Sequence, residues 1–507
     1  MLSIDDWQEA VAPSIRKAKA VDIDIAASPP DGVVVGVPVA ADGEPPAELP
    51  LDRDSMRAAG FTGEIGQTLA LPRRDGVTVL VGIGDPARLG VAGLRDVAAA
   101  LARATTTLDR VAFDLTGIDA PDPAATGRAV VEGALLARYR FDSLRREPSV
   151  TALTRLTLVT GDDRRETVGA GAEQGRRTSA ATQLARDLAN SPPVLLTAAR
   201  MAELAASIGP DRGLDVEVFD EDALGKLGCG GLLGVNAGSA EPPRMIKLTY
   251  VPRDDDGAPV AATGRLALVG KGIMYDAGGI ALKPADEVHA TMKNDMSGAG
   301  AILAAMLELR DVGCTAAVTA YLMCTDNRPS GTALAMGDVL TTRGGTSVEV
   351  VNTDAEGRLV MADALVLATE EPVDAIVDVA TLTGAAQRTF GARVAAVMGN
   401  DQALVDQVID AGAANDEPVW QLPLIREYRK QLDSPVADLK NLGGPNAGSI
   451  TAGLFLEEFV DGHPWAHIDI AGTAQNDEDA AWRPAGCTGF GARLLIDLAS
   501  RFRPTRP

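Results

Sequence analysis

The sequence predicts an α/β protein made of two α/β domains, a smaller one at the N-terminus and a larger one at the C-terminus. With 507 residues, the chain is longer than a single hydrophobic core usually supports. Short Val-rich runs alternate along it with Ala- and Leu-rich stretches of helical period, as in proteins built of β-α units. A charged and then Gly-rich stretch over residues 145–177 separates two such series. We therefore expect an N-terminal domain over residues 1–165, with a connector at its end, and a C-terminal domain over residues 177–507.

In the N-terminal part, short apolar runs rich in valine predict strands. After the second of them, an Ala, Leu and Arg pattern predicts a helix over residues 91–105. The alternation of strand and helix favours a parallel or mixed sheet. The predicted strands span residues 32–37, 77–84, 110–115 and 153–159.

The C-terminal part repeats the order of strand, polar loop and helix. Its first helix pattern starts at residue 178 and is stopped by Ser191-Pro192-Pro193, because proline cannot continue a helix. A second helix follows to residue 208. Further strands are predicted over residues 245–251, 265–269, 347–351 and 374–379, and further helices over residues 297–309 and 359–368.

The composition limits the classes of partner. The net charge of −23 disfavours nucleic acid and anionic membranes, which it repels, and suits cationic ligands or metal ions. No apolar run approaches the roughly 20 residues that span a bilayer. The first six residues lack the pattern of a signal peptide, and the four cysteines form no C-x-x-C pair. We therefore expect reduced thiols in a cytoplasmic protein without a membrane partner.

Residues 348–359, Val-Glu-Val-Val-Asn-Thr-Asp-Ala-Glu-Gly-Arg-Leu, are the most informative stretch. Asp354, Glu356 and Arg358 lie on a tight turn between a predicted strand and a predicted helix, where open α/β sheets bind ligands. Two carboxylates at this spacing can point the same way. An isolated Asp-x-Glu-x-Arg pattern is more often an Asx-turn with a helix cap and a surface ion pair. A second charged stretch with the same placement favours a site instead.

That second stretch follows the strand predicted over residues 265–269. Lys271 and Asp276 flank glycines, which let a backbone approach a ligand closely. Lys283 and Asp295 follow before the next predicted helix. Either lysine alone is more often a solvated surface residue. If the strand ends are neighbours on one sheet, however, the acids of both stretches come together.

Four carboxylates cannot share a site unless cations neutralise them. Two divalent metal ions, about 3.5–4 Å apart in dinuclear hydrolytic sites, would do so. The three histidines, His289, His463 and His467, share no metal-ligand spacing and are interpreted as structural or surface residues. The predicted centre is therefore based on carboxylates.

The two stretches resemble the signature of the leucyl (cytosol) aminopeptidases, the dinuclear-metal enzymes of the M17 peptidase family. The resemblance covers most of residues 177–507, whereas residues 1–150 are similar to the family's variable N-terminal α/β domain only in pattern. It implies a C-terminal catalytic peptidase domain with a central mixed sheet flanked by helices. The matching motifs are Leu188-Ala-Asn-Ser-Pro-Pro193, Lys271-Gly-Ile-x-x-Asp276-x-Gly-Gly-Ile, Lys283-Pro, Met292-Lys-x-Asp295-Met, Asn327-x-Pro-Ser-Gly331-Thr, Asn352-Thr-Asp354-Ala-Glu356-Gly-Arg358-Leu, Thr381-Leu-Thr-Gly384-Ala and Trp465-Ala-His-Ile-Asp-Ile-Ala-Gly472.

By this resemblance, Asp276 and Glu356 bridge two divalent metal ions, Mn²⁺ or Zn²⁺. Lys271, as a neutral amine, and Asp295 complete one metal site, and Asp354 completes the other. Carboxylate and amine ligands accept several divalent metals, so the sequence leaves the native metal open.

The resemblance also assigns the remaining side chains of the site. Lys283 and Arg358 match the catalytic pair of the family, in which a metal-bound hydroxide attacks the peptide bond. Lys283 would hydrogen-bond the developing oxyanion. Arg358 and the backbone near Leu382 would hold a bicarbonate. The pocket for the N-terminal side chain of the substrate would be lined by Met292, Thr381, Gly384 and Ala471.

The implied activity is the removal of N-terminal, apolar, Leu-like residues from peptides with a free N-terminus by a homohexamer. A phosphoesterase is an alternative, because carboxylate-rich dinuclear sites also hydrolyse phosphate esters. That chemistry usually needs more cations than Lys283 and Arg358 supply. An accessory DNA-binding role is disfavoured by the net charge of −23 and by the absence of a basic cluster.

Overall fold

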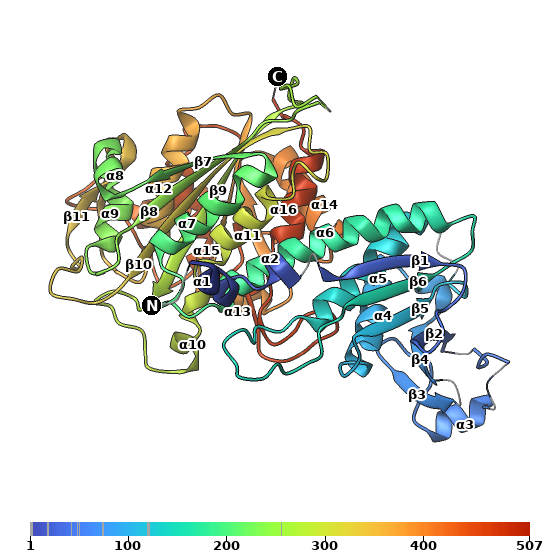
Figure 1. The fold of residues 1–507 in the computed structure, drawn as a ribbon. Coiled ribbons are helices and arrows are strands. Elements are labelled where there is room, and N and C mark those ends of the chain that lie inside the picture. The colour runs from blue at the N-terminus through green and yellow to red at the C-terminus, as the bar shows by residue number, and fades with distance from the viewer. Residues whose placement is uncertain are drawn as a thin grey trace. The chain divides into compact units, whose positions relative to one another are not determined.

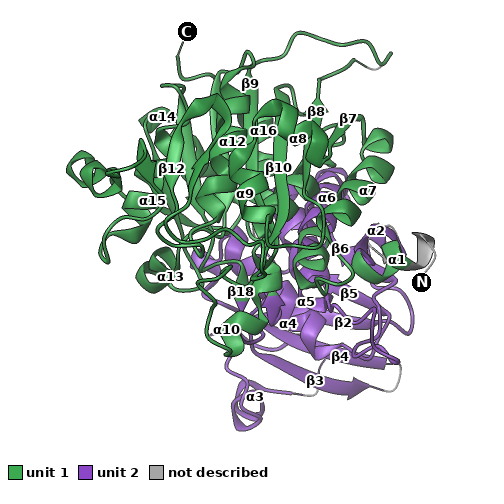
Figure 2. Ribbon diagram, turned by 90° about the vertical axis from the view of Figure 1, so that its left-hand side faces the viewer, with its two compact units in different colours: residues 1–11, 184–475, 487–507 green, residues 12–183, 476–486 purple. Residues whose placement is uncertain are grey.

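The structure, a computed structural model, describes residues 4–506 apart from 18–19, 42, 48, 50, 74–75, 119–121 and 255. Residues 1–3, part of the start without a signal-peptide pattern, lie outside the described residues. The chain divides into two compact units (Figure 2). Met1–Val11, Leu184–Gln475 and Cys487–Pro507 form the larger unit, and Ala12–Gln183 with Asn476–Gly486 forms the smaller. Both are mixed α/β structures, which confirms the predicted fold class.

The smaller unit is built on a six-stranded sheet in the order β1-β6-β5-β2-β4-β3 (Figure 1). Its neighbouring strands run parallel, except that β3 pairs antiparallel with β4. Helices α4 and α5 pack on each other and share an apolar core with the sheet. The elements are α2 (Ser14–Lys17), β1 (Asp22–Ala26), β2 (Val34–Ala40), α3 (Arg53–Ala58), β3 (Thr68–Arg73), β4 (Gly76–Gly84), η2 (Pro86–Arg88), α4 (Val91–Ala104), β5 (Arg110–Asp114), α5 (Pro123–Arg138) and β6 (Arg155–Val159).

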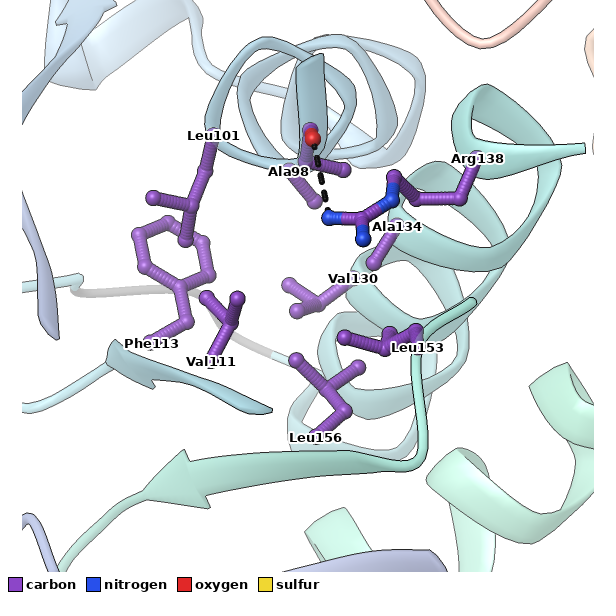
Figure 3. A pocket seen from close by; sticks show the side chains of 10 residues that line it. Ala98, Leu101, Val111, Phe113, Val130, Ala134, Arg138, Leu153 and Leu156 are labelled. Carbon is purple, nitrogen blue, oxygen red and sulfur yellow. Dashed lines mark hydrogen bonds between the residues drawn. The ribbon is translucent and has the colours of Figure 1, made fainter. Parts of the chain in front are cut away.

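A cavity of about 10 Å³ lies in this core, between apolar side chains such as Leu101, Phe113 and Leu156 (Figure 3). Arg138 stands at its edge and donates to the carbonyl oxygens of Ala102 (3.4 Å) and Thr105 (2.8 Å), at the C-terminal end of α4. A cation at this end of a helix is favourable. A volume of this size is about the smallest that could accommodate a single water molecule. A larger hollow of about 580 Å³ adjoins it, and neither is lined by an acidic cluster.

Helix α6 (Arg165–Asn190) differs from the sequence-based expectation of a connector up to residue 177. The Gly-rich stretch is part of this helix, and its glycines let α6 approach α5 closely. A Cβ on Gly171 would lie 1.9 Å from the carbonyl oxygen of Ala124, and one on Gly175 would lie 2.6 Å from that of Arg128. These glycines therefore serve helix packing.

The smaller unit also takes in residues 476–486, a segment from far along the chain, which we call the 476–486 loop. Its Asp479 accepts hydrogen bonds from Arg103 (2.5 Å) and Arg140 (2.7 Å). Its Trp482 is 2% exposed and belongs to the apolar core of the unit. The 476–486 loop thus packs as part of the smaller unit.

The larger unit is built on an eight-stranded sheet in the order β15-β14-β17-β13-β9-β10-β8-β7. The inner strands β17, β13, β9 and β10 run parallel, and antiparallel pairs flank them, so the sheet is mixed as expected. The strands are β7 (Leu214–Phe219), β8 (Arg244–Tyr250), β9 (Arg265–Asp276), β10 (Ala317–Asn327), β13 (Ala375–Ala380), β14 (Ala395–Gly399), β15 (Val419–Gln421) and β17 (Trp465–Asp469).

Helices cover both faces of the sheet (Figure 1). Gly270 on β9 faces Ala299 of α11, whereas the next residue, Lys271, faces Gly357 of α12. Successive residues of a strand point to opposite faces, so α11 and α12 lie on opposite sides. The helices of this unit are α1 (Ile4–Val11), α7 (Ala198–Ile208), η3 (Pro210–Arg212), α8 (Glu221–Leu227), α9 (Gly230–Asn236), α10 (Glu287–Ala290), η4 (Met292–Asn294), α11 (Ser297–Met306), η5 (Arg343–Gly345), α12 (Gly357–Thr369), α13 (Gly384–Phe390), α14 (Gln402–Ala414), η6 (Arg426–Leu432), α15 (Gly448–Glu457) and α16 (Ala492–Arg501).

The strand predicted over residues 347–351 does not join the central sheet. It is β12 (Ser347–Glu349), the middle strand of a three-stranded sheet with β11 (Val339–Thr341) and β16 (Leu439–Lys440). A two-stranded sheet is formed by β18 (Gln475–Asn476) and β19 (Gly486–Cys487). Throughout the described ranges, no helix combines the length and the apolar character needed to cross a bilayer.

Candidate metal centre

Strand β9 carries Lys271 and Asp276 directly, although the sequence predicted a loop after residue 269. The strand continues because β10 pairs with it as far as Asn327 opposite Asp276. Residues 271 and 276 would point to opposite faces of a regular strand. The pairing register shifts by one residue near Met274. Ile273 and Tyr275, two residues apart, lie opposite successive residues of β10. Such a bulge re-aims the side chains that follow it. Asp276 thus shares a face with Lys271.

Lys271 lies at the buried end of the site, with a side chain only 4% exposed. Its Nζ is 2.7 Å from Asp295 Oδ2 and 2.9 Å from Glu356 Oε1, and it donates to the carbonyl oxygen of Thr381 at 2.9 Å. Burial alone would lower the pKa of Lys271, but Asp295, Glu356 and Asp276 together raise that pKa above its usual value. The amine is therefore held among acids.

Lys283 occupies the opposite, more open end of the cluster. Its Nζ lies 2.8 Å from Asp276 Oδ2 and 2.5 Å from Asp354 Oδ1. The side chain of Asp354 is 34% exposed and that of Lys283 is 18% exposed. Those of Asp276, Asp295 and Glu356 are exposed by 6% or less. The site is thus accessible to solvent from the side of Lys283 and Asp354.

The turn that carries Asp354 and Glu356 is fixed by hydrogen bonds to its backbone. Asn441 donates to the carbonyl oxygens of Asn352 (2.7 Å) and Ala355 (3.2 Å). Arg358, which the sequence placed on this turn, is the second residue of α12. Residue 357 is glycine because a Cβ there would lie 2.6 Å from Cε of Lys271. The turn after β12 of the three-stranded sheet therefore lies beside the site residues of β9.

The acids repel one another in a buried setting. Burial raises the pKa of Glu356, and the charge of Asp276 adds to this effect. Burial likewise raises the pKa of Asp295, against the opposing effect of Lys271. Two lysines thus offset only part of the negative charge of four acids, as in a site adapted to bind further cations.

The donor atoms fit divalent metal ions. Carboxylate oxygens of Asp276, Asp354 and Glu356 lie within 4.8 Å of one another, so one ion could contact all three. Asp295 and the amine of Lys271 adjoin Glu356 and add further donors. Oxygen and amine donors of this kind are compatible with manganese or zinc. The structure therefore brings the predicted ligand residues into one cluster.

Arg358 is buried, at 4% exposure, close to the acids but without a direct partner for its Nε and Nη1 atoms. Burial lowers the pKa of Arg358 to about 10, while Glu356 and Asp469 oppose this shift. A buried guanidinium with unpaired N–H groups is a ready site for a small anion.

The predicted pocket residues sit on the loops around this cluster. Met292 begins η4, three residues before Asp295, and Gly384 begins α13. Thr381 donates to Asp295 Oδ1 at 2.6 Å. The backbone N–H groups of Leu382 and Ala471 both donate to Asp469 Oδ1, at 3.1 and 3.2 Å. The Leu382 N–H, predicted to hold an anion, thus has an acceptor in this structure.

Residues that support the ligands were not assigned a role from the sequence. Asn327 donates to Asp276 Oδ1 (2.8 Å), Glu356 Oε2 (3.4 Å) and the carbonyl of Thr353 (3.0 Å). Thr353 in turn donates to the carbonyl of Gly278 (2.7 Å). Asn327 ends β10, a strand that the pattern analysis did not predict. Its place in the Asn327-x-Pro-Ser-Gly331 motif was the available signal.

Each of the three histidines has a structural contact away from the acidic cluster. His467 is fully buried and pairs with Asp378. His463 contacts the carbonyl oxygen of Val460 at 3.0 Å through Nδ1. His289 stacks on Tyr275 with ring centroids 5.8 Å apart. None of them belongs to the acidic cluster found among the described residues.

Comparison with known proteins identifies relatives that span both parts of the chain. Residues 183–496 match the catalytic domain of the cytosol aminopeptidase family, and residues 53–148 match the N-terminal domain of that family. A probable cytosol aminopeptidase of Streptomyces avermitilis is 42% identical over 501 residues, which cover 92% of this chain and 95% of that protein. One of Chlorobaculum tepidum is 42% identical over 439 residues, covering 83% of this chain and 85% of its own.

Solved structures show the same architecture. Bottromycin maturation enzyme BotP in complex with Mn superposes with a TM-score of 0.84 at 37% sequence identity. The alignment covers 92% of this chain and 99% of BotP. With both domain types matched in order and the acidic cluster formed by the predicted residues, the chain belongs to the cytosol aminopeptidase family, M17, whose members are metal-dependent aminopeptidases.

Proposed function

We propose that the protein is a leucyl aminopeptidase that removes N-terminal, apolar residues from peptides at a dinuclear metal centre. The observation that carries the proposal is the cluster in which the buried Asp276 and Glu356 and the more exposed Asp354 lie within reach of one ion. Lys283 and Arg358 lie beside this cluster. Neither is a proposed metal ligand, so their cationic groups are available for catalysis.

In this proposal, Asp276 and Glu356 would be shared ligands of two divalent ions. Asp295 and the amine of Lys271 complete the buried ion site, because they already adjoin Glu356. Asp354 completes the other, at the open end of the cluster. Bound Mn²⁺ or Zn²⁺ would polarise the scissile carbonyl and activate water. The Mn in the name of the BotP structure supports manganese.

The chain's own cations then act on the substrate. Lys283 stands where the cluster opens to solvent, so its Nζ can turn from Asp276 and Asp354 to the oxygen of the scissile peptide bond. A donor so placed stabilises the negative charge that develops there. Arg358 would hold a bicarbonate on its unpaired N–H groups. Because Leu382 N–H donates to Asp469, the bicarbonate proposal depends mainly on Arg358.

The specificity proposal concerns the loops around the open end. Met292, Thr381, Gly384 and Ala471 would line the pocket for the N-terminal side chain of the substrate. Support comes from the contact of Thr381 with Asp295, which places the 381–384 loop against the predicted ligands. A preference for an apolar, Leu-like side chain is proposed from the family resemblance.

The test is a screen of aminoacyl amides with metal-stripped protein and each divalent metal added back. We expect hydrolysis of leucyl amide to return with Mn²⁺ or Zn²⁺, and N-acetyl-leucyl amide to resist cleavage because its amine is blocked. Full activity in verified metal-free protein, or no hydrolysis with any metal, overturns the proposal. Phosphate release from a generic phosphate ester under the same conditions would favour a phosphoesterase.

We also propose a cytoplasmic location and assembly into a homohexamer. The location is supported by the names of the relatives, which are cytosol aminopeptidases, and by four cysteines that are all free and buried. The assembly is proposed from the family resemblance.

A further inference from the structure

Asp469, a buried acid outside the predicted ligand set, joins two loops of the candidate site. It is the last residue of β17 and is 0% exposed. Its Oδ1 accepts backbone hydrogen bonds from Leu382 (3.1 Å), Thr383 (3.3 Å) and Ala471 (3.2 Å). Its Oδ2 accepts from the hydroxyl of Thr383 at 2.6 Å. One carboxylate therefore holds the loop after β13 and the loop after β17 together.

The register of the sheet explains why Asp469 reaches both loops. Strands β13 and β17 are parallel neighbours, and Ala380 at the end of β13 lies opposite Asp469. The chain leaves the sheet at the same level on both strands, so backbone N–H groups of the two loops are left without sheet partners. A buried carboxylate satisfies several such donors at once, and its removal would leave them unpaired.

The loop that Asp469 holds also contacts the predicted metal ligands. The carbonyl oxygen of Thr381 accepts a hydrogen bond from Lys271 Nζ (2.9 Å). The hydroxyl of Thr381 donates one to Asp295 Oδ1 (2.6 Å). The hydroxyl of Thr383 accepts from Ala386 N (3.1 Å) and thereby caps α13, which begins at Gly384. Asp469 thus bonds Leu382 and Thr383, which are next to Thr381 and Gly384 at the two ends of the predicted pocket loop.

We propose that Asp469 is a positioning residue that sets the spacing of the pocket for the substrate's N-terminal side chain, by fixing the Thr381–Gly384 loop against Ala471. This inference rests on the proposed aminopeptidase function. Asp469 acts through the two loops and has no direct contact with Lys271, Lys283 or the four predicted acidic ligands among the hydrogen bonds and ion pairs of the described residues. Its loss should therefore change selectivity more than metal content.

Asp378 provides a matched control. It is also 0% exposed and lies on β13, next to β17. It accepts a hydrogen bond from Trp465 Nε1 (2.7 Å) and pairs with His467, and both partners belong to β17 and not to the pocket loops. Asp378→Asn therefore removes a buried carboxylate from the same sheet without releasing the loops. General damage to the fold should appear equally in both variants.

The experiment compares kcat and KM of the metal-loaded wild type, Asp469→Asn and Asp378→Asn with leucyl and alanyl amides. Bound metal and thermal unfolding are measured on the same samples. We expect the ratio of kcat/KM for leucyl over alanyl amide to fall about tenfold in Asp469→Asn, the scale on which an apolar pocket discriminates side chains. The ratio should stay within about twofold of wild type in Asp378→Asn. Metal content should be unchanged in both.

A second pair of variants covers the case in which Asp469→Asn does not fold. Thr383→Ser keeps the hydroxyl that bonds Asp469 and caps α13, and should keep the wild-type selectivity. Thr383→Val removes that hydroxyl and should lower the ratio. An unchanged ratio in Asp469→Asn or Thr383→Val, or an equal fall in Asp378→Asn, overturns this inference alone. A wild type that cleaves neither amide with any metal overturns the proposed function, and this inference with it.

Discussion

Lys283 and Lys271 are both lysines of the candidate site but differ in exposure, and this difference separates their predicted roles. Lys283→Ala should lower kcat for leucyl amide on the order of a hundredfold, because one donor to the developing oxyanion is lost. The metal content should stay at the wild-type level, since the two proposed divalent ions would neutralise the four acids without Lys283. The measurement pairs kcat with metal analysis on one sample. Wild-type turnover in this variant would remove Lys283 from the mechanism.

Arg358 gives a second prediction at the residue scale. Its unpaired Nε and Nη1 atoms suit a bicarbonate, so kcat of the wild type in CO₂-depleted buffer should rise when bicarbonate is added. Arg358→Ala should lose this response, with a smaller loss of kcat than Lys283→Ala, because other anions partly replace the one that is lost. Arg358→Lys keeps the charge without the fork of donors and is the control. If Arg358→Ala first loses metal or stability, Arg358 is instead an ion-pair partner of Glu356.

At the scale of elements, the carboxylate of Asp363 connects three segments of the larger unit. From α12 it accepts hydrogen bonds from Leu232 N (2.8 Å), in the first turn of α9, and from Arg343 N (2.8 Å). Burial raises the pKa of Asp363 to about 7. The folded state therefore binds this proton more tightly than the unfolded state does. Its stabilising contribution is complete below the unfolded pKa, near 4, and is lost as the pH rises to about 7.

Asp363→Asn, which does not titrate, isolates this effect. The free energy of unfolding of the wild type, minus that of Asp363→Asn, should decrease between pH 4.5 and pH 7.5. Chemical denaturation at several pH values in that interval measures it. A difference that is constant with pH would show that the backbone donors keep Asp363 ionised in the folded protein.

The sequence predicted individual site residues better than the elements that carry them. Charged residues in the two motifs were recognisable one by one, and Lys271, Asp276, Asp295, Asp354 and Glu356 meet in the structure. Strand β9, however, extends past the predicted end at residue 269, since β10 pairs with it. Pairing, bulges and close helix packing depend on residues distant in sequence. Local patterns therefore missed the bulge near Met274 and interpreted the glycines of α6 as a connector.

At the scale of the whole molecule, the metal ions should stabilise the fold. Ions that bind only the native state raise its stability, by about 2.7 kcal/mol at a hundred times the dissociation constant. Chelation should therefore lower Tm, and added Mn²⁺ or Zn²⁺ should restore it in a concentration-dependent way. Lys271→Ala should show a smaller rise, because one ion site lacks a ligand. Equal Tm shifts in the wild type and this variant would exclude Lys271 as a ligand.

Assembly is the second prediction at this scale. Light scattering should report a particle six times the 52.4 kDa mass of one chain, as the family resemblance implies. The activity per chain should fall if dilution dissociates this particle. A stable and fully active monomer would contradict the hexamer.

The 476–486 loop has a consequence for the order in which the protein forms during synthesis. Arg103 and Arg140 contact an aspartate that follows them by 376 and 339 residues. At roughly 5–20 residues per second, the ribosome adds these residues over about 20 to 70 seconds. During that interval the smaller unit lacks Trp482 in its core and Asp479 beside Arg103 and Arg140. Although most of this unit is made first, it is completed only near the end of translation.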